Sequence, residues 1–134
     1  FRNHCASCHT EPLFTNNEFH NNGLTIDPYL NDYGRMRITN KSEDSLKFKV
    51  PTLRNIQFTP PYMHDGRFET LKAVITHYNS EINHSSTLSE SLKNNLQLTH
   101  KEEVDLLVFL RTLTDTDFLF NKRFSYPFNN QTIP

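Results

Sequence analysis

The chain has 134 residues, a formal net charge of −1 and a hydrophobic content of 35%. A length of this order suits one domain, and the near-neutral charge favours neither nucleic acid nor a charged membrane surface as a partner. No stretch approaches the ~20 consecutive apolar residues of a membrane span, and no signal peptide is recognised in a sequence that does not begin with Met.

The most informative motif lies close to the start of the chain, at Cys5-Ala6-Ser7-Cys8-His9. Two cysteines separated by two residues and followed at once by histidine form the attachment site of a c-type haem. On a helical turn these three side chains share one face, so Cys5 and Cys8 can bind the porphyrin while His9 binds the iron. We therefore expect residues 1–10 to form the end of a helix. Because haem c is attached outside the cytoplasm in bacteria, the motif also predicts a piece of an exported, periplasmic protein.

A Cys-x-x-Cys pair is also found in redox motifs and in zinc sites. A zinc site needs a second Cys or His pair at ligand spacing, and both cysteines of this chain lie in the one motif. A thioredoxin-like protein needs a βαβ frame around the pair, and the sequence shows no such pattern. A buried haem would also supply apolar volume to a chain with few apolar residues.

Residues 11–39 are rich in Asn, Gly, Asp and Pro and keep no helical or strand period, which predicts a long loop with short helical turns at most. A loop of this length suits a domain that wraps a large ligand. His20, inside it, is either a metal ligand or a loop histidine held by hydrogen bonds.

Farther along, Pro51 predicts an extended residue before it. Arg54 could bind a haem propionate through a bidentate contact, and it suits an ordinary surface position equally well.

Residues 59–68 form the second informative stretch, which reads Thr-Pro-Pro-Tyr-Met-His-Asp-Gly-Arg-Phe. The two prolines remove two backbone donors, and the Asp-Gly pair predicts a turn. Met63 has two interpretations. It could be the sixth iron ligand, as in mono-haem cytochromes c, or it could fill space in the core.

Two amphipathic helices follow. The first is predicted from Thr70 to Asn79, with Tyr78 on its buried face and His77 about 100° away around the axis. Tyr78 suits a core position, and it could also bind iron as a phenolate, as in catalase. Residues 80–98 predict a loop with one short amphipathic turn.

The second helix is predicted from His100 to Leu113. It begins with a capping box, in which Thr99 is the N-cap and Glu102 stands three residues later. Its helical period passes through Val104, Leu107 and Val108, and further leucines widen the apolar stripe. Scattered aromatic residues follow without a period. We expect a domain over residues 1–115 and an extended C-terminal tail over residues 116–134.

Taken together, these motifs resemble the second, C-terminal haem domain of the bacterial di-haem cytochrome c peroxidases and of the related methylamine-utilisation enzyme MauG. The resemblance runs from residue 1 to about residue 115. The matching segments are Cys5-Ala6-Ser7-Cys8-His9-Thr10, Phe48-Lys49-Val50-Pro51-Thr52-Leu53-Arg54-Asn55, Pro61-Tyr62-Met63-His64-Asp65-Gly66-Arg67-Phe68, Thr70-Leu71, His77-Tyr78-Asn79 and the capped final helix. The resemblance implies a mainly α, cytochrome c-like domain with long loops around one covalent haem.

The resemblance also implies ligands. In peroxidases of this group the distal ligand of this haem is usually a methionine that aligns with Tyr78, and in MauG-like members it is a tyrosine. This implies Tyr78 as the distal ligand, with Met63 as the alternative, and a phenolate in place of a thioether should lower the potential. A calcium ion between two haem domains is implied as well, bound by the backbone carbonyls of Thr59 and Pro61. His64 resembles a family histidine near the domain boundary, on the electron route or in a structural role.

The implied function is electron transfer within a periplasmic di-haem cytochrome c peroxidase. Electrons from a small periplasmic donor protein would pass through this haem to a peroxidatic haem in an N-terminal domain of the same chain, where hydrogen peroxide is reduced. The fragment alone would then lack full activity. The alternatives are a stand-alone electron-carrier cytochrome c, a haem module of a dehydrogenase and a MauG-like enzyme that oxidises a protein. A homodimer is compatible with the resemblance, whereas a nucleic acid partner is not expected.

Overall fold

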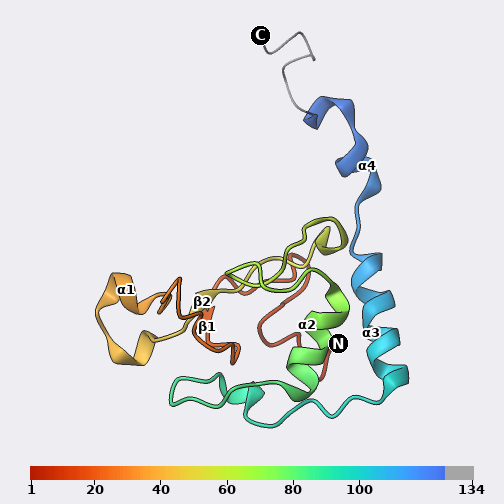
Figure 1. Cartoon of the computed structure of the whole chain (residues 1–134). Coiled ribbons are helices and arrows are strands. Elements are labelled where there is room, and N and C mark those ends of the chain that lie inside the picture. Colours follow the sequence, from red (N-terminus) through yellow and green to blue (C-terminus); the bar gives the residue numbers. More distant parts are fainter. Residues whose placement is uncertain (126–134) are drawn as a thin grey trace.

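The structure, a computed structural model, describes residues 1–125, and helices and loops dominate it (Figure 1). Its regular elements are β1 (Phe19–His20), α1 (Met36–Thr39), η1 (Ser42–Asp44), β2 (Phe48–Lys49), η2 (Ile56–Phe58), α2 (Leu71–Ser80), η3 (Glu90–Leu92), α3 (His100–Thr112), α4 (Thr116–Phe120) and η4 (Lys122–Phe124), where η marks a 3-10 turn. The two strands pair antiparallel, with Phe19 opposite Lys49. Within residues 1–125, no helix has both the length and the apolar character needed to cross a membrane.

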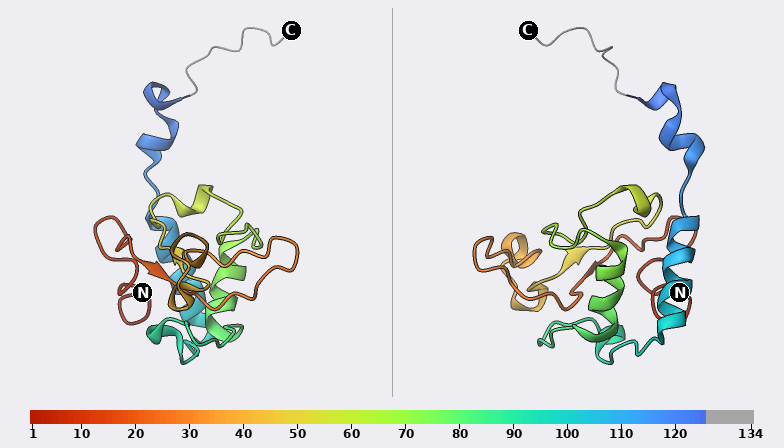
Figure 2. Two further views of the ribbon diagram at one scale, coloured as in Figure 1. Left: turned by 90° about the vertical axis from the view of Figure 1, so that its left-hand side faces the viewer. Right: turned by 45° about the vertical axis from the view of Figure 1, so that its right-hand side comes forward.

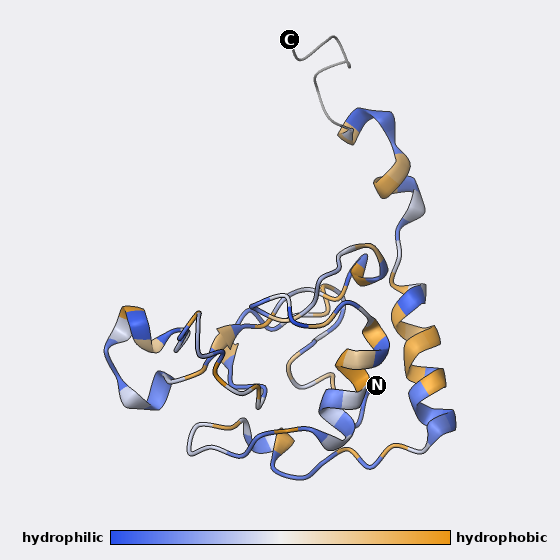
Figure 3. Cartoon of the chain, viewed as in Figure 1, coloured by the Kyte–Doolittle hydropathy of each residue, from blue (hydrophilic) through white to orange (hydrophobic). Residues whose placement is uncertain are grey.

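The core forms where α2 and α3 lie side by side, and both helices carry apolar residues there (Figure 3). Its buried members are Leu53, Tyr62, Leu71, Ile75 and Leu110. The N-terminal segment packs on the same core, because the ring of Phe1 lies 4.7 Å from that of Phe109, centroid to centroid. The start of the chain, which carries the two cysteines, is thereby fixed beside α3.

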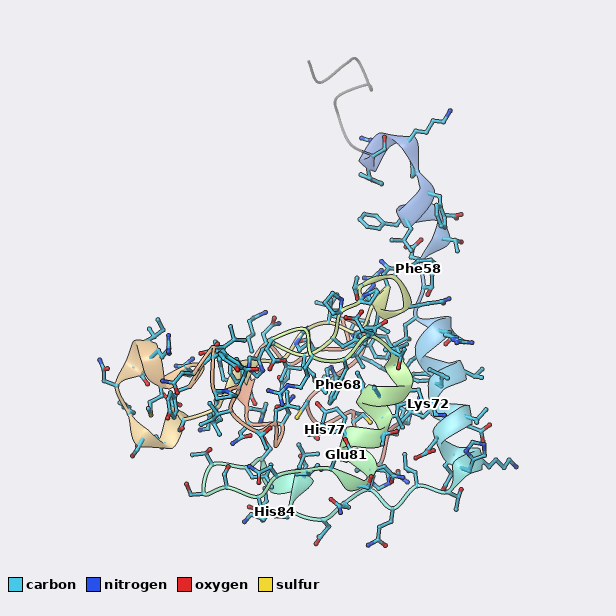
Figure 4. All side chains as sticks on the ribbon, in the orientation of Figure 1. Phe58, Phe68, Lys72, His77, Glu81 and His84 are labelled. Carbon is cyan, nitrogen blue, oxygen red and sulfur yellow. The ribbon has the colours of Figure 1, made fainter. Side chains whose placement is uncertain are left out.

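Helix α2 confirms the first predicted helix to within one residue at each end. Thr70 caps it, because its hydroxyl accepts a hydrogen bond from the backbone N–H of Ala73 at 3.2 Å. Its burial pattern differs from the prediction, since His77 is only 2% exposed whereas Tyr78 is half-buried. The reason is that α2 is covered twice, by α3 on one side and by residues 20–24 on another. Figure 4 shows Phe68 and His77 on the side of α2 that faces away from α3.

Helix α3 confirms the second predicted helix and its capping box, and its predicted apolar face in part. The Thr99 hydroxyl accepts from the Glu102 backbone, and the Glu102 carboxylate accepts from the Thr99 backbone N–H at 2.8 Å. Val104 and Val108 are 44% and 54% exposed, whereas Leu110 is buried. The residues of α3 and its C-cap that pack on the core are Leu106, Leu107, Phe109, Leu110 and Leu113, so the leucines of the predicted stripe are confirmed and its valines are not.

The predicted N-terminal helix is absent from the described residues as a regular element. Residues 2–9 form consecutive turns, with helix-like hydrogen bonds from the Cys5 N–H to the Phe1 carbonyl at 2.8 Å and from the His9 N–H to the Cys5 carbonyl at 2.9 Å. Each of these bonds joins residue i to residue i−4, as in an α-helix. The side chains of Cys5, Cys8 and His9 therefore share one face of a helical turn, although no regular helix forms there.

The tail also differs from the predicted extended segment. Residues 116–124 form α4 and η4, which project away from the rest of the domain (Figure 2). Phe120 contacts η2 through Phe58, with ring centroids 6.1 Å apart. The remaining predicted tail, residues 126–134, lies outside the described residues.

Candidate haem site

The two cysteines lie in the N-terminal turns and have not reacted with each other. Both thiols are free and half-buried. Burial raises the pKa of Cys5 and of Cys8, so both remain protonated thiols at neutral pH. Two unpaired thiols at positions i and i+3 of one turn are the groups that a covalent porphyrin attachment consumes.

His9 has the geometry of a metal-binding imidazole. Its Nδ1 atom lies 3.0 Å from the carbonyl oxygen of Phe14, so this nitrogen donates, and the neutral ring then has its lone pair on Nε2. Burial lowers the pKa of His9, although the carbonyls of Phe14 and Pro51 act in the opposite direction. The ring is therefore neutral at pH 7, which is the form that binds iron.

Tyr78, near the end of α2, lies in the same region as the two thiols. Burial raises the pKa of Tyr78 to about 12, and the neighbouring Cys5 and Cys8 add to the rise. A hydrogen bond with the Asn22 side chain acts in the opposite direction. In the structure, therefore, the phenol is protonated at neutral pH. A cation close to its oxygen would favour the phenolate.

Met63, the alternative ligand, already has a partner for its sulfur. The side-chain N–H of Asn22 donates to the Met63 Sδ atom at 3.4 Å. The same Asn22 side chain also lowers the pKa of Tyr78, so the two candidate distal ligands lie in one part of the domain.

Arg54 is exposed, and among residues 1–125 its side chain makes no ion pair or hydrogen bond. The backbone N–H of Arg54 donates to the Thr52 hydroxyl at 3.2 Å, which fixes the chain but leaves the guanidinium unengaged. The propionate contact remains a prediction.

Thr59 and Pro61 are exposed, and within the described residues neither carbonyl accepts a hydrogen bond. Unbonded carbonyl oxygens at the surface suit a hard cation. However, among residues 1–125 no cluster of three or more His, Cys, Asp or Glu side chains is arranged to hold a metal. The calcium site therefore stays a prediction that needs ligands from outside these residues.

Two other histidines are held by protein contacts. His20 lies in β1, where Nδ1 is 3.2 Å from the Ser89 hydroxyl and Nε2 is 3.3 Å from the Glu18 carboxylate. Of the two interpretations of His20, these contacts favour a histidine held by hydrogen bonds over a metal ligand. His64 stacks on Phe48, with centroids 3.6 Å apart and an angle of 13° between the planes.

Sequence reasoning missed the residues that fix the loop over α2. Asn21 is 1% exposed, and its side chain bonds to the hydroxyls of Ser85 and Thr87 at 3.0 and 2.8 Å. Asn22 donates to the Met63 Sδ atom at 3.4 Å. An Asn-Asn-Gly run predicts a turn. The partners of these hydrogen bonds lie more than 40 residues away in the sequence, so no local sequence pattern predicts them.

The donor set of the structure fits a covalently bound haem. It combines two unreacted thiols, a neutral imidazole with Nδ1 already occupied, and a phenol beside the thiols. These are the group types that hold the porphyrin ring and both axial positions of a haem iron.

Comparison with known proteins agrees with this donor set. No protein-family model matches the chain. It is 37% identical over 111 residues to the methylamine utilization protein MauG of Methylorubrum extorquens, a match that covers 81% of this chain and 30% of that protein. It is 35% identical over 131 residues to the cytochrome c551 peroxidase of Nitrosomonas europaea, covering 96% of this chain and 36% of that protein.

Solved structures show the same relationship. The crystal structure of a MauG-like protein associated with microbial copper homeostasis superposes with a TM-score of 0.79 at 35% identity, over 93% of this chain and 46% of that one. A variant of the diheme peroxidase BthA from Burkholderia thailandensis shares the fold, with a TM-score of 0.62 at 21% identity, over 84% of this chain and 38% of that one.

These relatives place the chain in a class of haem-related oxidoreductases. It belongs to the family of MauG and the di-haem cytochrome c peroxidases. The chain spans about a third of the length of the curated relatives that it matches.

Proposed function

We propose that this chain is the C-terminal, electron-transfer haem domain of a periplasmic di-haem peroxidase. In this domain of cytochrome c type, Cys5 and Cys8 hold the porphyrin, His9 is the proximal iron ligand and Tyr78 is the distal one. The observation that carries the proposal is the placement of a neutral, Nδ1-bonded His9 and a phenol in the same region as two free thiols.

When bound, the haem supplies reversible one-electron transfer between ferric and ferrous iron. The residues of the chain set the conditions for it. The Phe14 carbonyl fixes the orientation of His9 and increases the electron donation of its Nε2 atom. Packing of Phe1 and Phe14 on α3 keeps the attachment turn in place and limits the access of water.

Peroxide reduction itself belongs to the second haem, in an N-terminal domain of the same protein. One molecule of hydrogen peroxide takes up two electrons and two protons and gives two molecules of water. The electrons come from a small periplasmic donor protein and cross this domain one at a time. Support comes from the family membership and from relatives about three times as long as the matched segment.

A MauG-like function, in which a protein is oxidised, is the second candidate. It is favoured by Tyr78 at the distal position, because an anionic phenolate stabilises ferric or higher-valent iron whereas a thioether stabilises ferrous iron. A stand-alone electron carrier would use a His/Met pair, and the sulfur of Met63 is engaged by Asn22.

Two further contacts complete the proposal. The exposed Arg54 guanidinium binds a haem propionate. The carbonyls of Thr59 and Pro61 contribute to a calcium ion at the boundary with the N-terminal domain, which supplies the remaining ligands.

The ferric protein, matured in a host that attaches haem, tests the ligand assignment by visible and EPR spectroscopy. We expect Tyr78→Phe to change the spectrum, because it removes the distal oxygen ligand, and Met63→Leu to leave it unchanged. Met36→Leu, in the distant α1, is the control for loss of a methionine. A spectrum that changes in Met63→Leu alone would overturn the assignment of Tyr78.

A further inference from the structure

The side chain of Asn22 contacts one of the two candidate distal ligands. A carboxamide carries two N–H groups, and one of them donates to the Met63 Sδ atom at 3.4 Å. The same side chain is near enough to the Tyr78 phenol to lower the pKa of that group. Asn22 therefore holds the thioether in the part of the domain where the phenol lies.

The backbone of Asn22 is attached to the helix that carries Tyr78. The Nε2–H of His77 donates to the Asn22 carbonyl at 2.9 Å, and this histidine is 2% exposed. Because His77 directly precedes Tyr78 in α2, Asn22 and the phenol belong to one anchored unit.

Hydrogen bonds of the two neighbouring residues, Asn21 and Gly23, fix the position of Asn22 in the loop. The Asn21 Oδ1 atom accepts from the Gly23 N–H at 2.8 Å, and the Gly23 carbonyl accepts from the Asn83 N–H at 2.8 Å. Gly23 has φ of +75°, and a Cβ atom there would lie 2.5 Å from the Ile82 Cγ2 atom. The turn therefore needs glycine for conformation and for space.

Met63 is fixed as well, at the level of its backbone. Its φ is +74°, in the left-handed region that a non-glycine residue seldom adopts. The turn that follows holds it there, through a hydrogen bond from the Gly66 N–H to the Met63 carbonyl at 3.4 Å. With its backbone fixed, only rotation of the side chain can redirect the sulfur, and the Asn22 amide opposes that rotation.

We propose that Asn22 is a positioning residue that selects Tyr78 over Met63 as the distal iron ligand, by holding the Met63 sulfur in a hydrogen bond. A thioether sulfur binds iron through a lone pair, and a hydrogen bond directed at the sulfur competes for it. The inference rests on the proposed function, since it assumes that this chain binds a haem iron.

The test uses the haem-loaded full chain with Asn22→Leu, which removes both N–H groups at similar side-chain size. We expect the ferric protein to gain a sulfur-to-iron charge-transfer band and its midpoint potential to rise, because methionine ligation raises the potential of a haem. Both changes must disappear in Asn22→Leu/Met63→Leu. Asn22→Ala, which removes the same donors with a smaller side chain, must behave like Asn22→Leu.

Asn83→Leu is the matched control, because it removes an exposed amide beside the same loop, where Asn83 bonds to Gly23 through its backbone alone and contacts neither candidate ligand. It should keep the spectrum and potential of the unsubstituted protein. The absorption spectrum and the midpoint potential both depend on which atom binds the iron. A general loss of packing would not produce a sulfur-to-iron band that disappears when Met63 is replaced.

The outcomes separate this inference from the proposed function. If Tyr78→Phe shows that the unsubstituted protein has a phenolate ligand, and both Asn22 variants keep its spectrum and potential, only the inference fails. It also fails if the new band persists in the double variant. If the unsubstituted protein already has methionine ligation, the Tyr78 assignment fails and the inference fails with it.

Discussion

The strongest polar contact at the scale of single residues joins Asp65 to Arg67, in the turn after Met63. The Asp65 side chain is 3% exposed, and its carboxylate accepts from the Arg67 Nε atom at 2.8 Å. Arg67 also donates to the Thr25 carbonyl at 2.8 Å, which ties the turn to the loop over α2. Burial acts to raise the pKa of Asp65, but the hydrogen bonds from Arg67 outweigh it and lower the pKa.

Arg67→Met should therefore destabilise the protein at pH 7 by about 3–5 kcal/mol, because it removes the guanidinium from a buried carboxylate and leaves only the residue 67 backbone N–H and the His64 ring beside it. In urea unfolding, Arg37→Met is the control. Arg37 and Asp32 form an exposed pair at 3.8 Å, whose loss should cost less than about 1 kcal/mol.

The destabilisation by Arg67→Met should shrink as the pH falls from 7 toward about 4. In the unsubstituted protein the lowered pKa of Asp65 contributes stability that is fully present above the unfolded value of about 3.9 and is lost as the pH falls below that value through the lower pKa of the folded protein. In the variant, burial raises the pKa of Asp65 above the unfolded value, so protonation relieves the buried charge. A difference that stays constant with pH would show that Asp65 is not the group involved.

Residues with local motifs could be predicted from the sequence, and residues with distant contacts could not. Cys5, Cys8 and His9 are recognisable from spacing alone, because attachment to one porphyrin fixes their order. Asn22 has no such signature, since its partners lie 41 residues away at Met63 and 55 residues away at His77.

At the scale of elements, the N-cap of α3 connects local sequence to the packed core. The Thr99 hydroxyl accepts from the Glu102 N–H, and α3 then packs Leu110 against α2. Thr99→Ala should lower the free energy of unfolding by about 1 kcal/mol, which is typical of losing an N-cap.

Asp115→Ala is the comparison for this cap, because Asp115 accepts from the Phe118 N–H at 2.9 Å in the same way but caps the short, projecting α4. Loss of that cap should unfold α4 locally and shift global unfolding less. Equal shifts in the two variants, measured by urea unfolding, would mean that α4 is as integral to the fold as α3.

The existence of α2 and α3 was predictable, but the faces that they bury were predictable only in part. Caps and apolar periods are local signals, whereas a buried face depends on what packs against it. Val104 fits the apolar period of α3 and is exposed, and His77 interrupts the apolar period of α2 and is buried. The stretch of scattered aromatic residues after Asp115 has no clear period, yet Asp115 caps a short helix there.

At the scale of the whole molecule, two packed helices hold one side of the domain and long loops form the other. The loops include residues 21–35 and 81–89, joined by bonds such as that from the Ser89 N–H to the Asn21 carbonyl at 3.1 Å. The sequence predicted loops in these regions but not how they pack, because their hydrogen bonds are non-local. Their length is consistent with a domain folded around a large ligand.

The central claim is that Cys5 and Cys8 carry a covalently attached haem. The direct test is the mass of the denatured chain after maturation in a host that attaches haem to a second c-type cytochrome produced alongside it. We expect the mass of the chain plus one haem, and no covalently bound haem in the Cys5→Ala/Cys8→Ala variant. A chain with the bare polypeptide mass, while the second cytochrome is loaded, would contradict the account.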